Sequence, residues 1–292
     1  MSEAGKRYDF VTFLTDYGLQ DEFVAVCHGV IYSLAPHVRI IDICHEVPPF
    51  GVRAGALMLV RAVQYMPEAV HLAVVDPGVG TARKAIAVET ERGFFVGPDN
   101  GLLSPAVQMM GGARRAVEIS NEDLLLPRRG GLTFAGRDVF APAAAALASG
   151  TPLDDLGPEL PLESLVPMVV PLPRIERNRI DAEVLWIDRF GNCEINTSPE
   201  ELASTGAEIG ARLIIGIGGS EYEAVWARAF KDFEAGTVLL IEDHYGLLSV
   251  SVTEGNAAER LGLKEGMALS ILVTDTAEKR PSQDSDVNWK NR

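Results

Sequence analysis

Asp76 and Arg83 form the sharpest chemical pattern in the sequence, in the segment VVDPGVGTAR. Asp76 follows an apolar run and precedes a rigid Pro-Gly turn, and Arg83 comes seven residues later. Gly78 and Gly80 allow a ligand to approach the backbone closely, because glycine has no β-carbon. A carboxylate and a guanidinium held together could orient a water molecule for attack on a bound ligand. A plain salt bridge explains the same spacing equally well.

Asp16 is a second candidate, in the segment TDYGLQDEF at the end of an apolar run. A carboxylate in such a loop can accept hydrogen bonds from hydroxyl groups, such as the diol of a ribose. Aspartate is also common in turns and at the beginning of helices, where it caps backbone N–H groups. The local pattern alone favours this structural role.

The second half of the chain carries polar and aromatic side chains in its turns. Asp188, Phe190 and Asn192 share a turn in WIDRFGNCEIN, and Tyr245 lies in HYGLLSVSVTEGN, which ends in a Gly-Asn turn. An asparagine and an aromatic ring could bind a flat heterocycle, by hydrogen bonds to its edge and by stacking on its face. Taken singly, each segment is typical of a β-turn.

The segment GGLTFAGRDVFAP, residues 130–142, raises a different question. Thr133, Arg137 and Asp138 are polar in a glycine-rich turn that opens onto an alanine helix, and Ala135 among them offers no chemistry. The segment is either a well-capped helix start or a functional loop in which Ala135 contributes no reactive side chain.

Strands that alternate with helices must position these side chains in the first half of the chain. The order predicts an α/β domain over residues 1–165 with a mostly parallel central sheet. Ligands of such sheets gather at the carboxyl ends of the strands, where Asp16, His45 and Asp76 lie. The spacing of apolar residues predicts strands at 8–18, 38–47 and 69–80, helices at 21–36 and 53–67, and a strand hairpin at 84–101.

The composition changes near residue 165. Several prolines without a helical period predict a linker over residues 166–180. Short strands separated by turns follow, which predicts an all-β, barrel-like domain over residues 181–275. Within it, IGIGGSE is expected to be a hairpin turn rather than a phosphate-binding loop, because no helix follows the glycines. The polar and aperiodic residues 276–292 are expected to be disordered.

Composition and charge exclude several classes of protein. The chain has 292 residues and a formal net charge of −15, which disfavours nucleic acid and anionic membranes as partners, because both are bound by basic patches. Its three cysteines make no disulfide framework, and neither a signal peptide nor an apolar run of about 18 residues is seen, so we expect a soluble cytoplasmic protein. The five histidines form no HxxxH or HExxH motif, and we therefore expect no metal site.

Together these segments resemble one family, the S-adenosylmethionine (SAM) hydroxide adenosyltransferases, which are related to the adenosyl fluorinases and chlorinases. The resemblance covers roughly residues 9–275 and rests on seven segments in the same order and spacing: FLTDYGLQDEFV, DICHEVPPFGVRAG, VVDPGVGTAR, FVGPDNGLLSP, LTFAGRDVFAPAAA, IDRFGNCEIN and EGNAAERLGLKEG. It implies an α/β domain followed by a β-barrel domain, as the residue patterns also predict. It further implies a homotrimer in which the substrate lies between the first domain of one subunit and the second domain of its neighbour.

The resemblance also implies roles for individual residues. Asp16 would bind the ribose hydroxyls, Asp188 the methionine ammonium group, and Asn192 the edge of the adenine. SAM is the substrate, and no further cofactor is implied. The remaining contacts, around the sugar, the sulfonium and the adenine, would come from Phe50, Phe134, Gly136, Tyr245, Val252 and Glu254.

The catalytic residues that the resemblance implies are Asp76, Arg83 and a histidine, and Ala135 stands where the family has this histidine in TFHGRD. The fluorinase branch has tyrosine and serine in place of Asp76 and Gly136, so the hydroxide branch fits better. The predicted reaction is attack of water on the ribose 5′ carbon of SAM, which gives adenosine and L-methionine. Water is hardly ionised at neutral pH and is a poor nucleophile, and help with its proton is typically worth ~10²–10⁴ in rate. We therefore expect this active-site variant to be slow.

Two other functions stay open at this point. The first is a chloride-dependent adenosyltransferase, because Gly136 leaves room for a larger anion, although the Asp76 carboxylate would repel it. The second is a trimer that binds SAM or adenosine without turnover. Formation of 5′-chloro-5′-deoxyadenosine would identify the first function. Tight binding without turnover, even in the Ala135→His variant, would identify the second.

Overall fold

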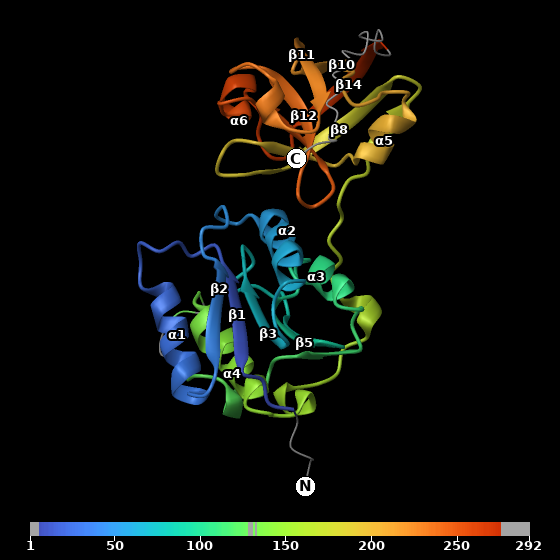
Figure 1. Cartoon of the computed structure of the whole chain (residues 1–292). Helices are drawn as coiled ribbons and strands as arrows, with labels where there is room; N and C mark the ends of the chain where they lie inside the picture. The colour runs from blue at the N-terminus through green and yellow to red at the C-terminus, as the bar shows by residue number, and fades with distance from the viewer. Residues whose placement is uncertain (1–5, 128–130, 132, 276–292) are drawn as a thin grey trace, which may run out of the picture. The chain divides into compact units, whose positions relative to one another are not determined.

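The structure is a computed structural model that describes residues 6–127, 131 and 133–275. Its contacts divide the chain into two units, Met1–Val169 and Val170–Arg292 (Figure 1). Each unit has a hydrophobic core of its own. Residues 276–292, for which we predicted disorder, lie outside the described residues. Within the described ranges, no helix is long and apolar enough to cross a membrane.

A six-stranded, mostly parallel sheet forms the centre of the first unit. Its strand order is β2-β1-β3-β5-β4-β6; the first four strands run parallel, and β4 is antiparallel to both of its neighbours. The predicted α/β fold is confirmed, and the predicted hairpin is the pair β4–β5. The strands are β1 (Phe10–Thr15), β2 (Arg39–Cys44), β3 (Ala69–Val74), β4 (Ala85–Thr90), β5 (Gly93–Pro98) and β6 (Arg115–Glu118).

Helices pack around this sheet (Figure 1). The helix α1 packs against α4, and α2 packs against α3. Every residue of α4 except Ala146 is buried. The small alanine side chains let this helix pack closely against α1, β1 and β3. The helices are α1 (Phe23–Leu34), α2 (Val52–Val63), α3 (Ser104–Met109) and α4 (Ala141–Ala148), with short 3-10 turns at Glu122–Leu124, Leu153–Leu156 and Leu162–Ser164.

The parallel strands place three polar side chains of interest at one edge of the sheet. Thr15 at the end of β1 pairs with Val74 at the end of β3, so Asp16 and Asp76 follow neighbouring strands. The strand β2 pairs with the other side of β1, and His45 follows β2 directly. These side chains therefore follow the carboxyl ends of three adjacent parallel strands, the edge at which folds of this kind bind ligands.

The second unit is a closed seven-stranded β-barrel, which confirms the predicted barrel-like domain. The strand order is β14-β10-β11-β12-β13-β9-β8; β8 pairs back onto β14 to close the barrel, and β7 is added outside β8. Gly218 and Gly219 both have a positive φ, as a two-residue hairpin turn requires, so the predicted hairpin in IGIGGSE is confirmed. The elements are β7 (Arg174–Glu176), β8 (Arg179–Ile187), β9 (Cys193–Ile195), α5 (Pro199–Ser204), β10 (Arg212–Ile217), β11 (Ser220–Ala227), a 3-10 turn (Phe230–Asp232), β12 (Val238–Glu242), β13 (Leu248–Val252), α6 (Ala257–Leu261) and β14 (Ala268–Asp275).

The strand β7 lies inside the range 166–180 for which we predicted a linker. The sequence gives no sign of this strand. Prolines at 167, 171 and 173 come just before it, and the strand itself lies in the segment RIERNRI, where charged residues outnumber apolar ones. Backbone pairing decides the matter instead: β7 forms an antiparallel hairpin with the first residues of β8 and so belongs to the barrel sheet.

Candidate functional site

Asp76 and Arg83 form a largely buried ion pair in the loop between β3 and β4. The Arg83 Nε atom lies 2.9 Å from both carboxylate oxygens of Asp76, and Nη2 donates a further hydrogen bond to Oδ2. The Asp76 side chain is 5% exposed and that of Arg83 16%. Thr81 shapes the loop between them, since its hydroxyl donates to the Gly78 carbonyl oxygen at 2.7 Å. The structure thus brings the predicted pair together and fixes the plane of the carboxylate.

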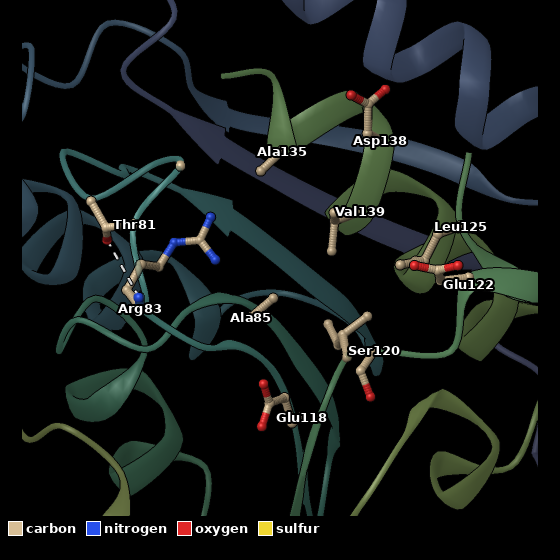
Figure 2. Close-up of a pocket in the computed structure, with 12 residues that line it drawn as sticks. Thr81, Arg83, Ala85, Glu118, Ser120, Glu122, Leu125, Ala135, Asp138 and Val139 are labelled. Atoms are coloured by element: carbon tan, nitrogen blue, oxygen red, sulfur yellow. Dashed lines mark hydrogen bonds between the residues drawn. The ribbon is translucent and has the colours of Figure 1, made fainter. Parts of the chain in front are cut away.

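Ala135 faces this region across a pocket of about 320 Å³ that it lines together with Arg83. Figure 2 shows the Ala135 methyl group directed toward the Arg83 guanidinium. The guanidinium also lies over the Phe140 ring, with Cζ 5.1 Å from the ring centre, which holds it in place. Glu118 and Ser120 line the opposite wall of the pocket. A longer side chain at position 135 would therefore have room to reach the ion pair.

The backbone at the start of α4 departs from α-helical geometry. Gly136–Phe140 form one turn of π-helix directly before α4, a feature that is frequent at functional sites. Asp138 in this turn is buried and accepts two hydrogen bonds from the Arg137 guanidinium, at 2.6 and 3.0 Å. The guanidinium also lies over the Phe134 ring, 5.0 Å from its centre. These polar residues therefore pair with each other and stabilise the helix start.

Tyr17 fills the space above Gly136. A β-carbon at Gly136 would lie closer than 3.0 Å to the Tyr17 hydroxyl oxygen, a separation that real β-carbons essentially never show. The Tyr17 ring packs edge-on against Phe134, and burial raises the pKa of Tyr17 well above its ordinary range. A side chain from a distant segment therefore lies directly at Gly136, where we expected room for a larger anion.

Asp16 is tied to the loop before α2. Its Oδ2 atom accepts a hydrogen bond from the Phe50 backbone N–H at 2.9 Å, and Phe50 has a φ of 65°, which is uncommon for a bulky residue. The Phe50 side chain is 70% exposed. Burial raises the pKa of Asp16, the Phe50 N–H opposes this rise, and the charge of Asp76 adds to it. One region therefore combines two carboxylates with an exposed aromatic ring.

In the second unit, Asp188 and Asn192 form one closed turn. Asp188 Oδ1 accepts hydrogen bonds from the backbone N–H groups of Phe190 and Asn192, at 2.8 and 2.9 Å. Its Oδ2 accepts from the Asn192 side-chain amide at 2.8 Å. Asn256 lies so close to Gly191 that a β-carbon there would overlap the Asn256 amide. The carboxylate of Asp188 therefore fixes the direction of the Asn192 side chain, and only glycine fits between the two turns.

The other predicted residues of the second unit lie at the two ends of β13. Val252 is the last residue of this strand, and Glu254 follows it with a φ of 54°. The strand β13 pairs with the beginning of β9, so this end of β13 lies near the Asp188 turn, which precedes β9. Tyr245 lies in the turn before β13, where its N–H donates to Asp243 Oδ1 at 2.8 Å. The length of β13 thus separates Tyr245 from Val252, and this unit by itself does not bring Tyr245 to the Asp188 turn.

Sequence reasoning missed two groups that the structure reveals. The contact of Tyr17 with Gly136 leaves no trace in either local pattern, since it joins segments far apart in the chain. His28, Asp42 and His45 place one ligand atom each within 4.8 Å of one another. A search for histidine pairs on one helix overlooks them, because α1 supplies the first and the end of β2 the other two. The spacing of an aspartate and a histidine at a strand end was the available signal.

Comparison with known proteins gives consistent matches over both units. The family model described as SAM hydroxide adenosyltransferase N-terminal domain matches residues 11–157, and that of the C-terminal domain matches residues 182–270. A curated (R)-S-adenosyl-L-methionine hydrolase of Salinispora arenicola is 48% identical over 262 residues, covering 90% of this chain and 97% of that protein. A fluorinase of Actinopolyspora mzabensis is 28% identical over 299 residues, covering 93% and 99%. A crystal structure of an uncharacterized conserved protein from Thermotoga maritima matches with a TM-score of 0.81 at 36% identity, covering 90% of this chain and 99% of that one.

Proposed function

The chain belongs to the SAM hydroxide adenosyltransferase family, and from this premise we propose that it is an enzyme that cleaves SAM with water to give adenosine and L-methionine. The curated hydrolase is far more similar to the chain than the fluorinase is. The observation that carries the assignment is the buried Asp76–Arg83 pair at the carboxyl edge of the sheet. A carboxylate at this place can orient water by accepting its hydrogen bond, whereas it repels a halide ion.

The proposed reaction is an in-line displacement at the ribose 5′ carbon. The water oxygen forms a bond to C5′ while the C5′–S bond breaks. The electron pair of the broken bond goes to sulfur, which leaves as the thioether of methionine, and one water proton is released. SAM is the substrate, and the proposed step uses no further cofactor.

Arg83 is proposed to act by fixing the Asp76 carboxylate, which accepts a hydrogen bond from the attacking water. Two guanidinium nitrogens hold the carboxylate, so it cannot rotate away, and the water it binds is aligned with C5′. Asp16 is proposed to accept hydrogen bonds from the ribose hydroxyls. Phe50 and Phe134 would line the pocket around the sugar and the sulfonium, where aromatic faces favour a cation.

The second unit is proposed to bind the two ends of SAM. Asp188 would meet the methionine ammonium group and Asn192 the edge of the adenine, a role supported by the hydrogen bond that fixes the Asn192 amide. The resemblance assigns further contacts to Tyr245 and to the backbone from Val252 to Glu254. It also implies a homotrimer whose sites combine residues of two subunits. The sequence composition leads us to expect a cytoplasmic location.

Two measurements test the trimer and its shared sites. Light scattering after gel filtration gives the mass of the assembly. Co-expression of Asp76→Asn subunits with Asn192→Ala subunits gives mixed trimers. If each site combines the first unit of one subunit with the second unit of its neighbour, some sites in these trimers contain both unchanged residues. Recovery of activity in the mixture supports the shared site, and a mixture as inactive as its components contradicts it. Cell fractionation tests the location.

Ala135 is proposed to make the reaction slow. Its methyl group faces Arg83, so a histidine at this position would bring an imidazole to the water that the ion pair orients. With alanine there, this position offers no group to take the proton as the new hydroxyl forms. In-line positioning by the pocket would remain, and positioning alone contributes substantially to rate.

A comparison of the protein with its Ala135→His variant tests the assignment. Each is incubated with SAM in ¹⁸O-labelled water, and adenosine and methionine are quantified by mass spectrometry. We expect turnover to rise by ~10²–10⁴ in the histidine variant, with ¹⁸O in the adenosine 5′ hydroxyl. Ala135→Gln is the matched control, because it adds similar bulk without an imidazole. Equal rates for the protein and Ala135→His would remove position 135 from the mechanism.

The same assay tests the two other functions. With chloride added, we expect no 5′-chloro-5′-deoxyadenosine, because Tyr17 occupies the space above Gly136. Formation of that product would instead identify a halide adenosyltransferase. Tight calorimetric binding of SAM without turnover in either protein would identify a binding protein and refute the proposed hydrolysis.

A further inference from the structure

We propose that His28, Asp42 and His45 form a binding site for one divalent transition-metal ion of the zinc class, which joins α1 to the end of β2. The three side chains all belong to the first unit, and no role in the proposed reaction is assigned to them. Their ligand atoms all lie within 4.8 Å of one another.

The distances between the ligand atoms suit a metal ion. His28 Nε2 and His45 Nε2 each lie 2.9 Å from Asp42 Oδ1. Zinc binds imidazole nitrogen and carboxylate oxygen at about 2.0–2.2 Å, so two such ligands lie about 3.4 Å apart in tetrahedral geometry and about 3 Å apart at right angles, close to the separations seen here. Because the three ligand atoms already lie within 4.8 Å of one another, movements of the Asp42 and His28 side chains, which are both partly exposed, would bring them into coordination distance.

The buried imidazole of His45 carries the argument. Its side chain is 4% exposed, yet Nε2 makes no hydrogen bond, although it is aimed into the cluster and lies close to Asp42 Oδ1. At this distance a protonated His45 would form an ion pair with Asp42, but only His28 Nε2 makes a hydrogen bond to that oxygen. A buried polar atom without a partner costs free energy, and a metal ion among the three ligands would remove that cost.

The surroundings hold both imidazole rings in place before any ion binds. The fully buried Phe13 ring packs against His45 at 4.8 Å and against His28 at 5.8 Å between ring centres. His45 Nδ1 lies 2.9 Å from the Thr15 hydroxyl, and a hydrogen bond donated from Nδ1 leaves the lone pair of Nε2 free for a metal. A second partner of this kind is typical of metal-binding histidines.

The donor set indicates the class of ion. Two neutral imidazoles and one carboxylate suit zinc, iron, cobalt and nickel, whereas calcium and magnesium prefer oxygen ligands. The Asp42 side chain is 43% exposed and that of His28 25%, so an ion can enter from solvent and keep water in its remaining positions.

Metal binding at this site would stabilise the loops of the proposed active site. The His45 carbonyl oxygen accepts a hydrogen bond from the Gly18 N–H at 2.6 Å, and the Val47 N–H donates to Thr15 at 3.3 Å. These bonds tie the loop after β2 to the one after β1, which contains Asp16. An ion on His45 would therefore restrain the segment that positions Asp16, without touching the substrate.

Cobalt binding provides a test that does not depend on turnover. The full chain, without a histidine tag and treated with a chelator, is titrated with Co²⁺, and the visible absorption of bound cobalt is recorded. Zn²⁺ is then added to displace it, and the thermal unfolding of the zinc-loaded protein is measured. We expect one Co²⁺ per chain, loss of its absorption with Zn²⁺, and a rise in the first unfolding temperature by roughly 5–10 °C at a hundredfold excess over Kd.

His28→Gln is the informative variant, because His28 is only half-buried and its replacement leaves the core intact. We expect it to lose the cobalt absorption and the thermal shift, and Asp42→Asn to weaken both. His37→Gln and His244→Gln, which change histidines outside the cluster, serve as controls and should bind as the parent does. Unchanged binding in His28→Gln, or no cobalt absorption in the parent, would show that the three residues are a hydrogen-bonded group only.

Discussion

Replacement of Gly136 by alanine tests how tightly Tyr17 is fitted against the start of α4. The new β-carbon would overlap the Tyr17 hydroxyl oxygen, and the ring carbons Cζ and Cε2 would lie only 3.0 and 3.1 Å away. The ring cannot simply retreat, because it packs against Phe134 and Phe23, each at a ring-centre distance of 5.8 Å. Gly136→Ala must therefore displace Tyr17, the helix start, or both.

The contacts allow the size of the effect to be worked out. Overpacking in a well-packed region lowers the free energy of unfolding by about 1–3 kcal/mol. Replacing a helical glycine with alanine raises it by about 0.5–1 kcal/mol. We expect Gly136→Ala to lower the free energy of unfolding by about 1–2 kcal/mol, which corresponds to a fall in Tm of roughly 2–8 °C. The Tyr17→Phe change removes the overlapping oxygen and leaves the ring. In that background, the cost of Gly136→Ala should fall clearly, because only the ring carbons at 3.0 and 3.1 Å remain close.

A double-mutant cycle measures this coupling. Urea unfolding of the parent, both single variants and the double variant gives the interaction energy, which we expect to be about 1–2 kcal/mol. Gly29→Ala in α1 is the matched control, because a β-carbon there meets nothing within 4 Å, and it should stabilise by about 0.5–1 kcal/mol. An equal cost of Gly136→Ala with and without the Tyr17 hydroxyl would refute the steric reasoning.

Two further predictions concern the ion pair and the pH dependence of stability. Arg83→Lys cannot keep both guanidinium bonds to Asp76. We therefore expect kcat/KM for SAM to fall by ~10², measured in the Ala135→His background, for which we expect the higher rate. Burial lowers the pKa of His71 from 6.5 to about 4, so the unfolded chain takes up a proton that the folded one does not as the pH falls through this range. We expect the free energy of unfolding, measured with urea, to fall by up to about 3 kcal/mol between pH 6.5 and 4. This fall should be smaller in the His71→Gln variant and as large as in the parent in the His37→Gln control.

Local sequence patterns were sufficient wherever a feature depends on residues close together in the chain. The turn between Asp76 and Arg83 spans few residues and contains glycines and a proline, so the ion pair could be expected from spacing alone. The hairpin at Gly218 and Gly219 is equally local, because two residues with positive φ define it. The strand β7 shows the limit of this approach. Its pairing with β8 makes it a strand, and a charged segment after three prolines gave no pattern for it.

The sequence by itself determined the alternation of strands and helices in the first unit, the barrel character of the second and the family resemblance, and it pointed to the residues proposed to bind SAM. Only the tertiary structure decided that Tyr17 occupies the space above Gly136, and that His28 meets Asp42 and His45. The physical reason is that parallel strands and the helices between them bring together side chains from segments far apart in the chain. Such contacts depend on the packing of whole elements, which no local spacing of residues records.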